Sequence, residues 1–167
     1  MTNIAVLISG QLRQFPKTVS VINSFLDWLK SQQSNIDVFV CSDNHHDSLK
    51  TLKYLKDSFF ISDIEEKEHL HFQISRLAIC YNLIKNHDKY DWFIKLRPDY
   101  TLDVSTFPEI KYWDKSKINC KFRLTNNRNI RDKLYFSWSG NCYWNNPNIP
   151  DDQLFIIPKS IHKKAFL

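Results

Sequence analysis

Glycine is scarce in this chain of 167 residues, which contains only Gly10 and Gly140. Phosphate-binding loops of the Walker type and of the dinucleotide-binding type need two or three glycines close together. The sequence therefore excludes both of these loops.

Long apolar runs and paired cysteines are also missing. No segment of 18 apolar residues occurs, so no membrane-spanning helix is expected. The N-terminal MTNIAVLISG lacks the basic region and apolar core of a signal peptide. None of the four cysteines (Cys41, Cys80, Cys120 and Cys142) stands in a C-x-x-C pair, which argues against a zinc site. These absences predict a cytoplasmic protein of a microbe or of a virus-infected cell.

The composition is that of a folded protein with a basic balance. Hydrophobic residues make up 43% and charged residues 25%, and the length suits a single domain. The net charge of +5 is compatible with a nucleic-acid partner or with a small anionic substrate such as a nucleoside diphosphate. Because the lysines are spread along the chain without a long basic block, nucleic acid is the less favoured partner.

The first forty residues predict a βαβ unit. Residues 4–8 (IAVLI) and 36–41 (IDVFVC) are short apolar runs, typical of strands covered on both faces. Between them, Pro16 suits a helix start, and apolar residues follow at helical spacing at Val19, Ile22, Leu26 and Leu29. This order favours parallel pairing of the two strands.

The rest of the chain predicts an α/β half followed by a mixed C-terminal part. Residues 65–86 form the clearest helix, with an apolar stripe (Ile74, Leu77, Ala78, Tyr81 and Ile84) from which Gln73, Arg76 and Asn82 are excluded. A short helix is predicted at 49–55 and a closing helix at 160–167. Strands are predicted at 59–61, 91–96, 117–124, 133–140 and 153–158, with a proline-containing loop at 145–153. We interpret residues 1–167 as one domain, with a nucleotide-binding half at 1–103 and an acceptor-side half at 104–167.

Three of the predicted strands end in polar segments. These are SGQLR (9–13), CSDN (41–44) and RPDYTLD (97–103). In open α/β sheets the ligand lies beyond the carboxyl ends of the strands. If the strands are parallel, these segments gather at one edge as a candidate site.

The RPD segment supports two interpretations. Pro98 fixes its own φ and biases Arg97 to an extended conformation, which gives Asp99 a defined direction. Asp99, helped by Asp103, could then bind Mn²⁺ or Mg²⁺, and such a cation would neutralise a diphosphate leaving group. Alternatively, the segment is a type I turn with Pro98 at its second position.

The segments after the first two strands offer nucleotide contacts. Gly10 and Gln11 stand where the chain could approach a ligand closely, Arg13 could bind phosphate bidentately, and Ser9 could bind the base or ribose. Asp43 could accept a hydrogen bond from ribose or base. The simpler alternatives are an ordinary loop with a surface arginine, and an aspartate that caps a helix or turn.

Further candidates lie elsewhere in the chain. Asp151 or Asp152 could deprotonate an acceptor hydroxyl, although a solvated acidic turn explains them as well. Arg76 is a further phosphate candidate. The pair His45-His46 and the later His162 could bind a metal, but solvated surface histidines are the favoured interpretation.

Four segments in order, IAVLISGQLRQF, IDVFVCSDN, YDWFIKLRPDYTL and DDQLFIIPKS, resemble a group of glycosyltransferase-like proteins of bacteria and large DNA viruses. The group is similar to the GT-A class of nucleotide-sugar-dependent transferases. The resemblance covers about residues 3–160. It implies a Rossmann-like GT-A fold with a mostly parallel sheet flanked by helices, and sugar transfer from a UDP- or GDP-sugar to a glycan or glycoprotein.

The resemblance also assigns roles to residues. It implies that Ser9, Gly10, Arg13 and Asp43 lie near the nucleotide, and that Asp151 or Asp152 lies near the catalytic acid on the acceptor side. Asp99 stands at the last acid of the D-x-D metal motif. Arg97 stands at the first acid, which brings metal dependence into question. The alternative expectation is a non-catalytic module that binds a nucleotide sugar or a glycan.

Overall fold

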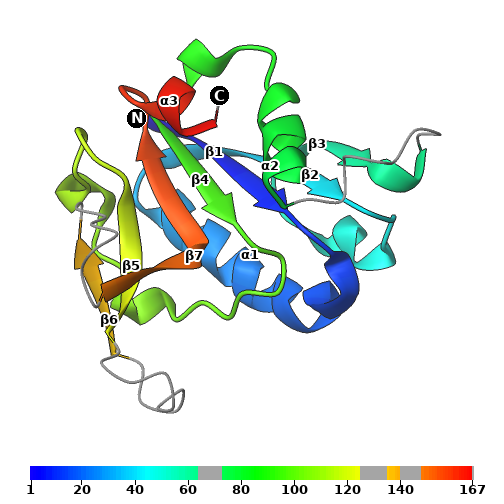
Figure 1. Ribbon diagram of the computed structural model, residues 1–167, viewed down its shortest axis with the longest axis horizontal. Coiled ribbons are helices and arrows are strands. Elements are labelled where there is room, and N and C mark those ends of the chain that lie inside the picture. The colour runs from blue at the N-terminus through cyan, green and yellow to red at the C-terminus, as the bar shows by residue number, and fades with distance from the viewer. Residues whose placement is uncertain (64–72, 125–134, 140–147, 167) are drawn as a thin grey trace.

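The computed structural model describes residues 1–63, 73–124, 135–139 and 148–166, with the backbone alone for 121–124, 135–139 and 148–152. The described part is an α/β fold built on a seven-stranded mixed sheet in the order β3-β2-β1-β4-β7-β5-β6 (Figure 1). The expected α/β class is confirmed.

The predicted βαβ unit is confirmed. Strand β1 (Thr2–Ser9) leads into helix α1 (Phe15–Ser31) and then into strand β2 (Ser34–Ser42), with Pro16 in the first turn of the helix. The two strands pair in parallel, with Ile4 opposite Ile36 and Ile8 opposite Val40. Both runs are apolar on both faces because helices cover both sides of the sheet.

The next strands complete a parallel set of four. Strand β3 (Leu55–Phe60) pairs in parallel with β2, and β4 (Trp92–Leu96) pairs in parallel with β1. The helix predicted at 49–55 is instead a short 3₁₀-helix at Asp47–Thr51. The helix predicted at 65–86 is described as α2 (Gln73–Asn82), so its C-terminal boundary was set too late, and residues 64–72 lie outside the described part.

The predicted apolar stripe of α2 is wrong in part. Ile74 is 82% exposed, while Arg76 and Cys80 are buried together with Tyr81. Cys80 explains this orientation, because its thiol lies over the sheet and donates to the Phe39 carbonyl at 3.2 Å. Arg76, one turn earlier, then faces the carboxyl edge of the strands.

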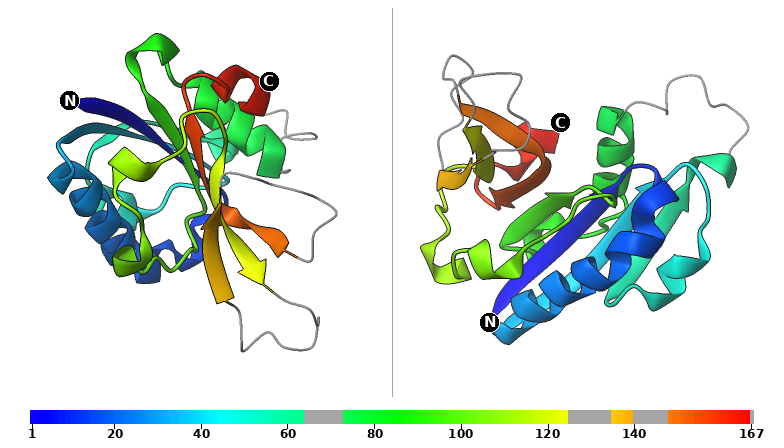
Figure 2. Two further views of the ribbon diagram at one scale, coloured as in Figure 1. Left: turned by 90° about the vertical axis from the view of Figure 1, so that its left-hand side faces the viewer. Right: turned by 90° about the horizontal axis from the view of Figure 1, so that it is seen from below.

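Two apolar cores lie on the two faces of the sheet. Helices α1 and α2 cover these faces from opposite sides (Figure 2). On one face α1 packs Phe25 and Leu26 over the alternate residues Ile4, Val6 and Ile8 of β1. On the other face α2 and the closing helix α3 (His162–Phe166) cover Ala5, Leu7 and Phe93. Burial of these residues provides the main stabilisation of the sheet.

The C-terminal part of the sheet is antiparallel. Strands β5 (Asn119–Leu124) and β6 (Tyr135–Ser139) pair antiparallel, and β7 (Asn148–Pro158) joins β5 to β4 by antiparallel pairing on both sides. The loop predicted at 145–153 is therefore wrong from residue 148 onward. Residues 148–152 belong to β7, and this half of β7 pairs with β5 beyond the end of β4.

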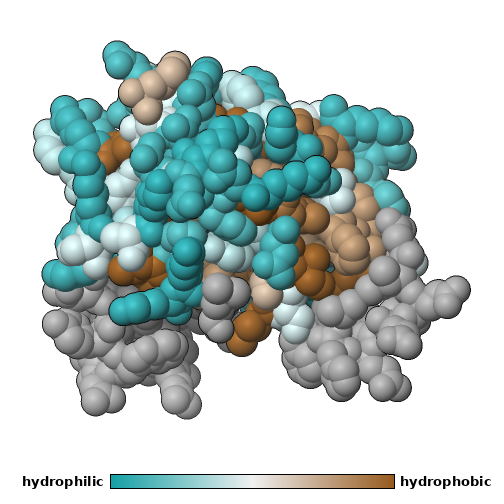
Figure 3. All heavy atoms as spheres, turned by 90° about the horizontal axis from the view of Figure 1, so that it is seen from above, coloured by the Kyte–Doolittle hydropathy of each residue, from teal (hydrophilic) through white to brown (hydrophobic). Residues whose placement is uncertain are grey.

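Seen from the side of the chain termini, the described surface is largely hydrophilic, with apolar side chains showing between polar ones (Figure 3). Among the described residues, no helix has the length and apolar character needed to cross a membrane.

Candidate functional site

The strand order creates a switch point between β1 and β4. From β1 the chain adds β2 and β3 on one side, and then returns to place β4 on the other side of β1. The connections after β1 and β4 therefore leave the sheet in different directions at its carboxyl edge. Such a point is where open α/β sheets bind their ligands.

A cavity of about 390 Å³ lies at this switch point. Three arginines and one aspartate are among its lining side chains, so its charge favours an anion. The structure thus brings together most of the predicted site residues. The lining consists of Ser9, Gly10, Gln11, Arg13, Gln14, Gln73, Arg76, Arg97, Pro98 and Asp99.

Gly10 joins the two walls of the cavity. Its φ of +143° is unfavourable for residues with a side chain, and a Cβ there would lie 3.0 Å from Pro98 Cδ. Its N–H donates to the Cys41 carbonyl at 3.1 Å, which ties the first loop to the end of β2. The glycine is thus required by packing against Pro98.

Residues 97–100 form the turn expected as the simpler interpretation, and the same turn makes one wall of the cavity. The Tyr100 N–H donates to the Arg97 carbonyl at 3.3 Å, with Pro98 at the second position. The buried Thr18 hydroxyl donates to the Pro98 carbonyl at 2.5 Å, and the Arg97 N–H donates to the Gln153 carbonyl at 3.0 Å. Helix α1 and strand β7 thus both hold the turn in place.

Within this turn Arg97 and Asp99 form a bidentate ion pair. Arg97 Nε donates to Asp99 Oδ1 at 2.9 Å, and Nη2 donates to Oδ2 at 2.7 Å. Each side chain is about one-third exposed, at 31% and 34%. The hydrogen bond from Arg97 is the main reason that the pKa of Asp99 is lowered from its usual value.

The two acids predicted to bind a divalent cation, Asp99 and Asp103, have protein partners in this structure. Both oxygens of Asp99 already accept from Arg97. Asp103 does not line the cavity; its carboxylate caps a short 3₁₀-helix at Val104–Thr106 by accepting from the Ser105 N–H and hydroxyl. Among the described residues, no cluster of three His, Cys, Asp or Glu side chains could hold a metal ion.

Arg76 and Asp43 form a second, more deeply placed ion pair. Arg76 Nη2 lies 2.7 Å from Asp43 Oδ1, and the two side chains are only 8% and 18% exposed. Asp43 borders a neighbouring hollow of about 250 Å³, which shares Gln11 and Arg13 with the cavity. The ion pair therefore stands between the two hollows.

Several buried polar atoms at this edge have no hydrogen-bond partner among the described residues. These atoms are Ser9 Oγ, Ser42 Oγ, Asp43 Oδ1 and Arg76 Nε, and the Arg76–Asp43 contact is thus an ion pair without hydrogen-bond geometry. Buried polar groups are normally paired, and unpaired ones indicate a missing partner such as a ligand or water. Two of the four residues, Ser9 and Arg76, line the cavity.

Asp151 and Asp152 belong to β7, and their side chains lie outside the described part. Cys120 of β5 pairs with Phe155 of β7, and Phe122 pairs with Pro150. One residue lies between the two partners in β5, whereas four residues lie between the two partners in β7. The acid pair thus lies in a bulge, a feature found often beside active sites. The Arg97–Gln153 backbone bond brings this bulge to the same edge of the sheet as the cavity.

His45, His46 and His162 do not line the cavity. His46 caps the 3₁₀-helix Asp47–Thr51 by accepting from the Ser48 N–H, and His45 packs its ring on Phe60 at 3.7 Å between centroids. The surface interpretation of His162 is wrong, because it is 3% exposed and bonds the Tyr81 hydroxyl at 2.6 Å. Burial lowers the pKa of His162.

A larger hollow of about 1000 Å³ lies at the opposite edge of the sheet, between the start of β4 and residues 109–115. It contains none of the predicted site residues, and its polar groups include Asp91, Glu109 and Lys159, which have mixed charge. The charge of the lining residues therefore favours the smaller cavity, with its three arginines, as the binding site for an anion. No motif in the sequence pointed to Gln14 and Gln73, which also line that cavity.

Comparison of the chain with protein families, with characterised proteins and with solved structures finds no match in any of the three.

Proposed function

We propose that this protein is a small glycosyltransferase of the GT-A type, which transfers a sugar from a nucleoside diphosphate to an acceptor hydroxyl. The observation that carries the proposal is the convergence of Arg13, Arg76 and Arg97 on one cavity at the switch point of the sheet. Guanidinium groups bind phosphate bidentately, so three of them suit a diphosphate.

The surroundings of the arginines supply groups for the rest of a nucleotide. Ser9 and Gln11 offer hydrogen bonds beside the cavity, and Asp43 faces the adjoining hollow that shares Gln11 and Arg13 with it. A diphosphate in the cavity would place ribose and base toward this second hollow. The buried hydroxyl of Ser9 would then gain the partner that it lacks among the described residues.

The proposed reaction needs a base and a stabilised leaving group. The acceptor oxygen forms a bond to the anomeric carbon, while the bond from that carbon to the diphosphate oxygen breaks. Asp151 or Asp152 takes the proton of the acceptor hydroxyl in an inverting mechanism. The arginines stabilise the charge that develops on the departing nucleoside diphosphate. The acceptor would approach from the side of residues 104–167.

A non-catalytic module that binds a nucleotide sugar is the second candidate. It is favoured by the pairing of Asp99 with Arg97, which engages the acid that would ligate a metal in the class that the sequence resembles. Such a module would keep the diphosphate site and lack turnover.

Release of UDP or GDP from a panel of UDP- and GDP-sugars distinguishes the two candidates. The transferase predicts slow donor hydrolysis without acceptor, and Asp151→Asn with Asp152→Asn should lower this rate while donor binding persists. Binding of a donor with no turnover in any metal would support the module instead. Asp114→Asn, at an exposed turn remote from the cavity, is the matched control.

A further inference from the structure

Asp99 is the one carboxylate among the described residues that line the cavity, and it is already engaged. Both of its oxygens accept from Arg97, at 2.9 and 2.7 Å. Pro98 lies between the two residues, and the Tyr100 N–H closes the turn around them. The pair is therefore built into the wall of the cavity.

We propose that the cavity binds a diphosphate group through its arginines without a divalent cation, and that Asp99 is a positioning residue that orients Arg97. This inference rests on the proposed function, because the diphosphate is that of the nucleotide donor.

Electrostatics disfavours a cation at Asp99. An ion bound to either oxygen would lie next to the Arg97 guanidinium, and the two positive charges would repel each other at close range. Arg13 adds a further positive charge to the lining of the same cavity, while the charge of Arg76 is balanced by Asp43. Asp103, the other acid predicted to help, holds Ser105 instead.

The arginines can take over the task of a cation. Arg76 is only 7% exposed, lines the cavity, and has an Nε–H without a partner among the described residues. Arg13 lines the same cavity from a different element, the 3₁₀-helix Leu12–Gln14 that follows β1. Guanidinium groups from these two elements can bind the two phosphates bidentately.

Asp99 gives the third arginine its direction. Two parallel N–H···O bonds fix the plane of a guanidinium as well as its position. The carboxylate thereby restricts Arg97 to one orientation at the rim of the cavity and lowers the conformational entropy lost when an anion binds.

Calorimetric titration with inorganic pyrophosphate, UDP and GDP, each in EDTA and in Mn²⁺, tests whether diphosphate binding requires a metal ion. We expect pyrophosphate and one nucleotide to bind in EDTA with an affinity within about threefold of that in Mn²⁺. Binding that is at least about tenfold weaker in EDTA would overturn the inference and leave the proposed function standing.

The remaining outcomes separate the two proposals. If pyrophosphate binds in EDTA but neither nucleotide binds under either condition, the arginine site stands and the nucleotide-sugar function fails. If none of the three probes binds under either condition, both are overturned.

The role of Asp99 is tested by Asp99→Asn, which keeps the size of the side chain and one acceptor oxygen. Removal of a negative charge would by itself strengthen anion binding, whereas loss of the orienting pair weakens it. We expect pyrophosphate binding in EDTA to weaken about three- to tenfold, and Arg97→Lys to weaken it similarly. Stronger or unchanged binding by Asp99→Asn would overturn the positioning role.

A matched control and a folding check accompany these variants. Asp47→Asn removes a carboxylate that pairs with Lys50 at 2.7 Å on the exposed surface, outside the cavity, and should leave pyrophosphate binding unchanged. Thermal unfolding of each variant verifies the fold. The comparison of EDTA with Mn²⁺ needs only the unmodified protein, so it decides the metal question even if a variant fails to fold.

Discussion

Gly10 and Pro98 lie in direct contact, so that a Cβ on Gly10 would be 3.0 Å from Pro98 Cδ. This contact joins the loop after β1 to the turn after β4, the two connections that diverge at the switch point. The shape of the arginine-lined cavity depends on how closely these two segments approach each other.

Replacement of Gly10 by alanine should destabilise the protein and distort the cavity. The methyl group meets Pro98, and the φ of +143° strains any residue with a side chain. We expect a loss of about 1–3 kcal/mol in the free energy of unfolding, measured by urea denaturation.

The double variant Gly10→Ala/Pro98→Ala separates the two causes. The double variant removes the clash but keeps the backbone strain. Its loss in unfolding free energy should therefore be smaller than the sum of the losses of the two single variants. Full additivity of the two substitutions would contradict direct contact between these residues.

Loss of Arg76 should be costly because its partner is poorly exposed. Arg76→Ala leaves the Asp43 carboxylate, 18% exposed, without its ion pair. We expect a loss of about 3 kcal/mol in unfolding free energy, and a smaller loss when Asp43→Asn is added. The control is Lys53→Ala, which breaks the half-exposed pair with Asp27 and should cost much less. Equal losses in unfolding free energy for Arg76→Ala and Lys53→Ala would argue against a buried ion pair between Arg76 and Asp43.

Periodicity and strand ends predicted much of this architecture. The apolar run at 4–8 became β1 because its residues are buried on both faces, and the polar ends of β1 and β4 met at one edge because the strands are parallel. Arg13, Arg97 and Asp99 were thereby expected at one edge of the sheet, and they line one cavity there.

The start of β7 could not be predicted, because Pro147 and Pro150 are typical of loops. Residues 154–158 pair with β4, whereas residues 148–150 pair with β5 only. Proline is tolerated in a strand on a side without a ladder partner. Residues 148–152 are a strand because of their position beside β5, which the local sequence does not reveal.

The buried position of Arg76 was also hidden from the sequence. An arginine outside an apolar stripe is normally exposed. Here the helix faces the sheet through Cys80, and the residue one turn earlier reaches the polar edge near Asp43. The Asp43 carboxylate balances the charge of Arg76, and only the tertiary structure brings these two residues together.

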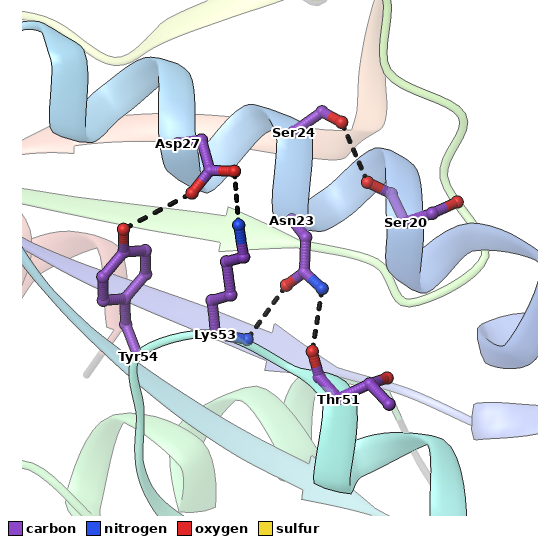
Figure 4. Close-up of polar contacts among 7 residues, drawn as sticks. All are labelled: Ser20, Asn23, Ser24, Asp27, Thr51, Lys53 and Tyr54. Atoms are coloured by element: carbon purple, nitrogen blue, oxygen red, sulfur yellow. Dashed lines mark hydrogen bonds and ion pairs between the residues drawn. The ribbon is translucent and has the colours of Figure 1, made fainter.

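Asn23 fastens the connection before β3 to helix α1 (Figure 4). Its side-chain NH₂ donates to the Thr51 carbonyl at 2.8 Å, and its oxygen accepts from the Lys53 N–H at 2.9 Å. Asn23→Ala loses both bonds but gains helix propensity, so a net loss of about 0.5–1 kcal/mol is expected in urea unfolding.

The control for Asn23 lies one residue further along the helix. Ser24 donates only to the Ser20 carbonyl within α1, at 3.0 Å, so Ser24→Ala should leave stability unchanged or slightly higher. A similar loss in both variants would point to a general effect on α1.

Stability should fall as the pH drops below about 6.5, the usual pKa of an unfolded histidine. Burial lowers the pKa of His162, so the folded protein binds this proton less readily than the unfolded chain does. The stability is therefore present above the unfolded pKa and is lost on acidification, by at most about 1.4 kcal/mol per pH unit. Urea midpoints at pH 7.5 and 5.5 measure this slope.

The variant His162→Asn should flatten this dependence, because the side chain can still bond the Tyr81 hydroxyl and carries no proton equilibrium in this range. An unchanged slope in the variant would assign the pH effect to another group.

Titration of the unmodified protein with UDP and with GDP, in the presence and absence of Mn²⁺, tests the central claim that the arginine-lined cavity is a nucleoside-diphosphate site. We expect micromolar binding of one of the two, weakened at least about tenfold by Arg13→Ala, whose side chain lines the cavity and is exposed. Absence of binding by both nucleotides under both conditions would contradict it.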